Sequence, residues 1–172
     1  DVTFADGADI ITASAGTSNF RAGVNAGNSI ESGGNYNTVV GDEAGTAITT
    51  GDNNTAVGAV AGTAITTGLQ NTLIGALAGD ALTDADFNTA LGFQALSAAI
   101  TSDGNTAIGR YALLSDTQGN LSVAVGRDAL RAQNMGSDLD AYNTAVGAIA
   151  GTAITTGVAN TLIGGLAGDA LT

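Results

Sequence analysis

Among the side chains of this chain, the aspartate carboxylates are the best candidates for catalysis. The chain has no His or Cys, and all four of its basic residues are Arg. This composition excludes serine–histidine and cysteine–histidine nucleophiles, typical zinc sites and lysine-based chemistry. Asp116, Asp128, Asp138 and Asp140 remain as candidates for the paired acids of a glycosidase. The alternative is that they are solvated loop acids, and we therefore expect no catalytic residues and no enzymatic activity.

Two acidic segments contain the oxygen ligands that calcium prefers. Asp80, Asp84 and Asp86 lie in the first segment, and Asp138 and Asp140 lie in the second. Neither has the spacing of an EF-hand or of a Gly-rich nonapeptide loop. These five residues are candidates for structural calcium, with plain surface turns as the alternative. We expect no metal and no other cofactor.

Aromatic side chains recur at two places in the pattern. Tyr36, Phe87 and Tyr142 each directly precede an Asn-Thr pair, whereas Phe93 and Tyr111 come shortly after it. Exposed aromatic rings here would offer faces for a sugar to stack on. The alternative is that they cap the ends of a thin apolar core.

The residues that could do this chemistry are held in a repeat. The motif Asn-Thr-x-aliphatic-Gly recurs every 17 residues, with Ser122 opening a variant copy and four extra residues before Asn143. We number each repeat, or rung, from position 1, the Asn, and name it by that residue. The rungs begin near residues 20, 37, 54, 71, 88, 105, 122, 143 and 160, the first being degenerate.

The extra residues fall in the segment 133–141. Functional contacts often lie on such insertions in repeat proteins. Arg131, Met135 and Tyr142 are therefore candidate binding residues, with neutral drift of a loop as the alternative.

Three columns of the repeat are nearly invariant. Position 1 is Asn, which we expect to form a stacked amide ladder. Position 5 is Gly, which indicates a positive φ or a close approach between backbones. Position 8 is Ala, which indicates a tight internal site. The Asn residues are Asn37, Asn54, Asn71, Asn88, Asn105, Asn143 and Asn160. The Gly residues are Gly41, Gly58, Gly75, Gly92, Gly109, Gly126, Gly147 and Gly164. The Ala residues are Ala44, Ala61, Ala78, Ala95, Ala112, Ala129, Ala150 and Ala167.

Positions 3 and 4 are both apolar in every rung, as in Val39 and Val40. Neighbouring residues of a strand point to opposite faces, so both faces of this strand are apolar. One face packs inside a thin roll, and the other needs a partner outside it. The pattern therefore predicts an oligomer.

The sequence predicts an all-β fold, a parallel β-solenoid of 17-residue rungs over residues 20–172, preceded by a leading strand or connector at 1–19. The segment 46–51 and its equivalents predict a second strand in three rungs. The rungs from residue 88 to the insertion are compatible with short helical turns instead. The last rung stops partway at Thr172, so we expect further repeats in the full protein.

The chain carries a formal charge of −12. Nucleic acids and anionic membranes bind to basic patches, so neither is expected as a partner. Every apolar stretch is shorter than the roughly 18 residues that a membrane span needs, so membrane insertion is not expected either.

The rungs NTAVGAVAGTAITTGLQ and NTALGFQALSAAITSDG resemble the repeats of phage tail fibres and are more distantly similar to the heads of trimeric autotransporter adhesins. The adhesin heads have shorter repeats and form trimers of β-rolls. The resemblance covers residues 20–172 and implies a homotrimer with a role in attachment. It also implies a location on a virion or at a cell surface.

The sequence therefore predicts a non-enzymatic segment of a trimeric attachment fibre, such as a phage tail fibre, with a cell-surface glycan or protein as receptor. The first alternative is a bacterial adhesin head that binds glycan or matrix. The second is an ice-binding solenoid, which would use arrays of Thr.

Overall fold

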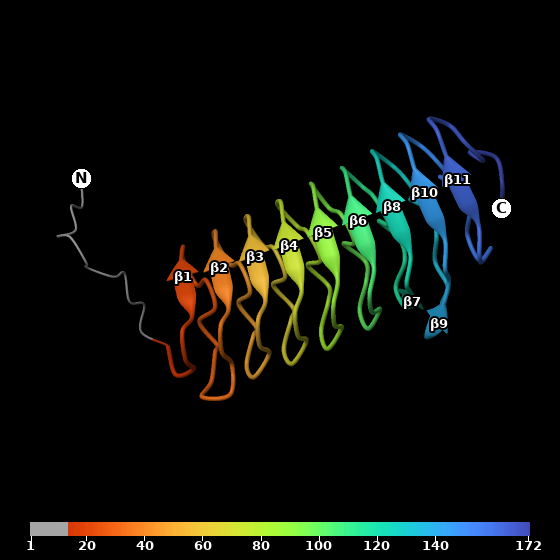
Figure 1. The fold of residues 1–172 in the computed structure, drawn as a ribbon. Coiled ribbons are helices and arrows are strands. Elements are labelled where there is room, and N and C mark those ends of the chain that lie inside the picture. The colour runs from red at the N-terminus through yellow and green to blue at the C-terminus, as the bar shows by residue number, and fades with distance from the viewer. Residues whose placement is uncertain (1–13) are drawn as a thin grey trace, which may run out of the picture.

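The computed structural model of the chain describes residues 14–172. Residues 1–13 of the expected connector at 1–19 lie outside the described residues. Residues 14–172 form a parallel β-solenoid of about eight turns, with repeats of about 17 residues. Figure 1 shows the rungs stacked as a rod, with β1 at one end and β11 at the other. The predicted fold class is confirmed, but the short helical turns are not, because residues 14–172 contain no helix.

One strand of each rung contributes to a long sheet whose strands pair in parallel and in register. The Thr of one rung lies beside the Thr of the next, as in Thr55 beside Thr72. The strands, in order along the sheet, are β1 (Phe20–Ala22), β2 (Thr38–Val40), β3 (Thr55–Val57), β4 (Thr72–Ile74), β5 (Thr89–Leu91), β6 (Thr106–Ile108), β8 (Val123–Val125), β10 (Thr144–Val146) and β11 (Thr161–Ile163). At about 4.8 Å per strand, the nine strands make a rod roughly 38 Å long.

A second sheet of two short strands lies at the insertion. Strand β7 (Gly119–Asn120) pairs in parallel with β9 (Leu139–Asp140). The extra residues thus leave the rung between Met135 and Ala141 and return to it, so the next strand, β10, keeps its register with β8.

The core is a narrow column of buried apolar side chains along the rod. Position 3 points inward and is fully buried from Val39 to Ala145, and position 8 is fully buried from Ala44 to Ala150. The remaining volume of each rung is filled from positions 9 and 12. Because each cross-section holds so few side chains, no rung could bury its apolar face without its neighbours.

The Gly at position 5 turns the chain out of each strand. Its φ is 138° in Gly58, a conformation that side chains disfavour. A Cβ on Gly58 would lie 2.6 Å from the carbonyl carbon and oxygen of Gly75, the same residue of the next rung. Any side chain at this position would therefore force adjacent rungs apart.

The Asn at position 1 links each rung to its neighbours through a buried ladder. The Oδ1 atom of Asn71 accepts a hydrogen bond from the backbone N–H of Asn88 at 3.0 Å. Its Nδ2 donates to the carbonyl of Ala85, at the far side of the same rung, at 2.7 Å. Asn71 is fully buried, so one side chain both closes its own rung and fixes the next.

Two irregular rungs keep the ladder by other means. In the first rung Asn19 takes the ladder position. Its Oδ1 atom accepts a hydrogen bond from the backbone N–H of Asn37 at 2.8 Å, although the two residues are 18 rather than 17 positions apart. Where Ser122 replaces Asn, buried Gln133 reaches across the core. Its Nε2 donates to Ser122 Oγ at 3.0 Å, and its Oε1 accepts from Asn143 Nδ2 at 2.8 Å.

In the three rungs with this segment, the second half contains no strand, so the prediction of a strand over residues 46–51 and its equivalents is wrong. Glu43 and Gly45 both have positive φ, which breaks the extended backbone before this segment can form one. The segment still stacks on the next rung, since Ala47 N–H donates to the Thr63 carbonyl at 3.0 Å. Turns, rather than strands, therefore close these three rungs.

The large and the small side chain at positions 9 and 12 change places between rungs. In rung 54 they are Gly62 and Ile65, and a Cβ on Gly62 would come within 2.9 Å of the Ile65 Cδ1 atom. In rung 88 they are Leu96 and Ala99, both fully buried. The large apolar side chain thus enters the core from one position or the other. In rungs 105 and 122, where position 9 is Leu, position 12 holds a buried polar side chain, Asp116 or Gln133.

This exchange predicts strong coupling between the two positions. Leu96→Gly should lose roughly 2–4 kcal/mol of unfolding free energy by opening a cavity, and Ala99→Ile should lose roughly 1–3 kcal/mol by overpacking. The double variant reproduces rung 54 and removes a leucine from positive φ, so it should lie within about 1 kcal/mol of the parent. Urea unfolding of all four proteins measures the coupling. Additive losses would contradict this account of the core.

Candidate functional site

The outward face of the nine-stranded sheet is the largest regular surface of the rod. Positions 2 and 4 of each strand point away from the core, so a row of Thr runs beside a row of aliphatic residues. The Thr row comprises Thr38, Thr55, Thr72, Thr89, Thr106, Thr144 and Thr161, with Val123 in the gap. The aliphatic row comprises Val40, Val57, Ile74, Leu91, Ile108, Val125, Val146 and Ile163.

The aliphatic row is open to solvent in the single chain. Ile74 is 37% exposed, Leu91 is 44% exposed and Ile163, in the end strand, is 73% exposed. Positions 2 and 4 carry no charged residue from β2 to β11. This uncharged, partly apolar face contrasts with a chain whose net charge is −12.

The candidate binding residues around the insertion do not form one surface. Met135 is only 8% exposed and its side chain packs against Gly119, so it is not available to a ligand at the surface. Tyr142 is exposed, and its hydroxyl donates to Asp140 at 2.9 Å, which raises the pKa of the phenol. Arg131 lies on a different edge, beside Asp128 and Tyr111.

The candidate glycosidase acids lie in different surroundings. Asp116 is buried in the core, where it accepts hydrogen bonds from Gln133 and from the N–H of Gly119. Asp128 is paired with arginine on an outer edge, whereas Asp138 and Asp140 are exposed in the inserted segment. Buried Asp116 is therefore unavailable to a substrate at the surface.

The candidate calcium ligands are occupied with protein donors. Asp80 accepts from Ser97 Oγ at 2.6 Å, Asp86 from the N–H of Leu69 at 2.7 Å, and Asp138 from Asn120 Nδ2 at 2.7 Å. Within the part of the chain that the structure describes, no three acidic side chains are grouped to hold a metal ion. The calcium hypothesis thus gains no geometric support from residues 14–172.

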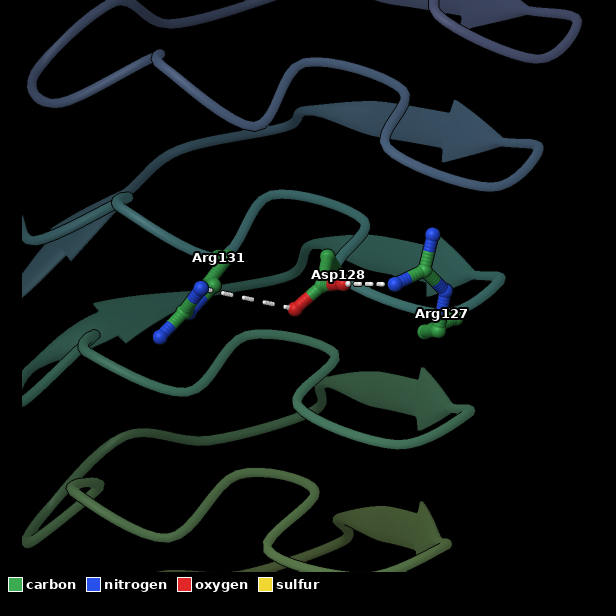
Figure 2. Close-up of polar contacts among 3 residues, drawn as sticks. All are labelled: Arg127, Asp128 and Arg131. Atoms are coloured by element: carbon green, nitrogen blue, oxygen red, sulfur yellow. Dashed lines mark ion pairs between the residues drawn. The ribbon is translucent and has the colours of Figure 1, made fainter.

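A cluster of arginine and aromatic side chains occupies one edge of rungs 88, 105 and 122. The Arg110 guanidinium lies 4.3 Å from the centre of the Tyr111 ring, and that of Arg131 lies 5.2 Å from it. The ring of Phe93 packs against Tyr111 with 5.7 Å between centres. Figure 2 shows Asp128 between Arg127 and Arg131, its carboxylate bridging the two guanidinium groups. We call Phe93, Arg110, Tyr111, Arg127 and Arg131 the arginine–aromatic cluster.

In this cluster, Arg110 and Arg127 were not among the candidate residues, whereas Arg131 was a binding candidate and Phe93 and Tyr111 were candidates for stacking on a sugar. Its members come from three rungs and are far apart in the sequence. The signal was present in the repeat, because Phe93, Arg110 and Arg127 all occupy position 6 and therefore stack along the rod. Comparing outward positions between rungs, rather than scanning for local motifs, would have found it.

A second polar ladder runs along the outside at position 16. The carboxylate of Asp103 accepts the N–H of Asp86 at 2.7 Å, and the amide oxygen of Asn120 accepts the N–H of Asp103 at 2.8 Å. Partial burial raises the pKa of Asp103, as do the nearby charges of Asp86, Asp138 and Asp84. The hydrogen bond from Asp86 opposes this rise without cancelling it.

A raised carboxyl pKa makes ionised Asp103 a source of instability. Just above the ordinary value of 3.8, the folded state binds more protons than the unfolded state. Stability therefore falls as the pH rises through the raised pKa. Asp103→Asn should keep the ladder bond, as Asn120 does, and unfold at a higher temperature than the parent at pH 7.

That gain should vanish near pH 3, where Asp103 is protonated in both states. Asp52→Asn is the matched control, because its position-16 neighbours, Asn35 and Leu69, are uncharged. Thermal unfolding followed by circular dichroism at the two pH values measures the effect. An equal gain at both would show that charge is not the cause.

Within residues 14–172, no helix has the length and apolar character of a membrane span. No protein-family model, curated protein or solved structure matches the chain. The function is therefore inferred from the residues and their geometry.

Proposed function

We propose that this chain is a non-enzymatic segment of an extracellular attachment fibre, of the kind found in phage tail fibres. In the fibre, the outward sheet faces of three copies pack against one another around a common axis. The observation that carries the proposal is the row of outward aliphatic side chains from Val40 to Ile163, each of which is exposed or half-buried. The fibre would be displayed on a virion or at a cell surface, with a receptor for its partner.

A second copy fits this face better than an unrelated partner does. The aliphatic side chains repeat once per rung, and another copy presents the same row at the same spacing. The face carries no charge from β2 to β11, so copies that are each strongly acidic can approach through it with least repulsion. Burying the row would remove apolar surface from water at about 25 cal/mol per Å².

The repeat suits a structural role. Each rung contacts only its neighbours, so length can be gained or lost in whole rungs without altering the rest. The inside of the rod is filled by side chains from every rung, as the buried rows at positions 3 and 8 show. The residues that remain free to vary lie on the outer edges, where a receptor would contact them.

The outward Thr row supports ice binding as a second candidate. Its hydroxyl and methyl groups lie on a regular sheet, beside the aliphatic row, over β2 to β6 without interruption. Val123 interrupts the row in β8. Ice binding needs this face open to water, whereas the fibre covers it, so the state of association separates the two.

Light scattering during size exclusion should give the mass of a trimer. Ile74→Asp with Ile108→Asp places two charges on the outward face and should yield a folded monomer, because each charge would lose its water in the assembly. Ile100→Asp with Val158→Asp, two exposed positions away from the strands, should remain trimeric.

Circular dichroism should show both variants folded. A folded monomer from the unaltered chain would overturn the fibre proposal. Thermal hysteresis of ice growth by that monomer would then favour ice binding.

A further inference from the structure

The arginine–aromatic cluster concentrates positive charge on an acidic chain. Three of the four basic residues in the sequence, Arg110, Arg127 and Arg131, lie on the outer edges of two consecutive rungs. Asp128 is the single carboxylate paired with them within residues 14–172. The cluster therefore keeps a local positive charge, although the chain as a whole carries −12.

The cluster is held in place before any ligand arrives. The Asp128 side chain is 13% exposed and lies 3.1 Å from Arg127 Nη1 and 3.7 Å from Arg131 Nη1. Half-buried Tyr111 supports Arg110 and Arg131 from one side through cation–π contacts. Ordering these long side chains in advance lowers the entropic cost of binding.

The guanidinium groups nevertheless remain available to a ligand. The side chain of Arg127 is 55% exposed, that of Arg131 is 50% exposed, and Phe93, two rungs away on the same edge, is 43% exposed. Guanidinium forks bind planar oxyanions through paired hydrogen bonds. An exposed aromatic ring offers an apolar face against which the C–H groups of a sugar can pack.

We propose that this edge of the rod binds an acidic glycan, a sugar chain with a carboxylate or sulfate group. The anionic group binds the exposed sides of the Arg127 and Arg131 guanidinium groups that face away from Asp128, and an adjoining sugar ring packs on Phe93. The proposal rests on the proposed attachment function, for which it names the receptor chemistry. Asp128 serves as a positioning residue that fixes the two guanidinium groups.

The charge of the whole chain argues for a glycan rather than a nucleic acid or an acidic peptide. A long polyanion lying along the rod would meet the excess of negative charge outside the cluster. A ligand with one or two anionic groups joined by neutral, stackable rings meets only the cluster. The aromatic rings would add nothing for an acidic peptide without such rings.

The test is a titration of the purified chain with oligosaccharides, followed by nuclear magnetic resonance. The probes are trigalacturonate, a sulfated galactotriose and neutral galactotriose, each up to about 10 mM, the range of weak binding. At least one acidic trisaccharide should bind at least ten times more tightly than the neutral one, and more weakly as salt is raised. The two acidic probes distinguish a carboxylate from a sulfate as the recognised group.

Variants locate the site. Arg127→Gln with Arg131→Gln should weaken binding of the acidic probe at least tenfold, and Phe93→Ser should weaken it severalfold without changing the charge. Asn53→Asp with Gln70→Glu lowers the net charge by the same two units at exposed positions several rungs away. This control should bind as the parent does.

Several outcomes would overturn the proposal. The first is that neither acidic probe binds. The second is that the arginine variant binds as the parent does. The third is that hexaglutamate binds as tightly as the acidic sugar, which would indicate that charge alone is recognised. A trimer that binds no acidic glycan would reject this inference and leave the fibre intact. A monomer that binds one would reject the fibre and keep the site.

Discussion

The fold depends on one interaction, the hydrogen bonds that the buried Asn at position 1 makes within its rung and to the next. Asn71 shows both, since it binds the Ala85 carbonyl of its own rung and the Asn88 N–H of its neighbour. The irregular rungs show how strictly this link is kept. Where Ser122 interrupts the ladder, Gln133 supplies amide atoms from across the core, and the inserted residues leave the rung so that Asn143 returns to the ladder.

The repeat explains why so much of the fold could be predicted. A residue type recurring every 17 positions must occupy equivalent sites, so the Asn, Gly and aliphatic columns placed the strands and their faces. The second half of the rung was harder, because its backbone is set by positive φ at residues as different as Glu43, Val60 and Tyr111. No side-chain pattern indicates such a turn. The sequence shows that positions 9 and 12 change together, as Leu96 and Ala99 in one rung and as Gly62 and Ile65 in another. This change could be interpreted as compensation in volume only once both positions were known to face the core.

The positions of the candidate site residues could be predicted only in part. Arg131 and Tyr142 are on the surface, yet they face different edges of the rod, and Met135 is buried. A solenoid brings together residues at equal positions of successive rungs rather than residues near one another in sequence. Its interior therefore draws on the same few positions in every rung, whereas each outer edge can carry its own chemistry. The sheet face is suited to association and the arginine–aromatic cluster to recognition, and neither disturbs the ladder inside.

The free energy of unfolding of Asn71→Ala, compared with that of Gln70→Ala, tests the central role of the ladder most directly. The first change leaves the buried Ala85 carbonyl and Asn88 N–H without their partner. At roughly 1–3 kcal/mol for each orphaned group, it should cost about 2–6 kcal/mol. The second alters an exposed residue at a position where Ala159 occurs naturally, and should cost less than about 0.5 kcal/mol. Equal and small losses in the two variants would show that packing and backbone stacking hold the rungs without the ladder, and would contradict this account.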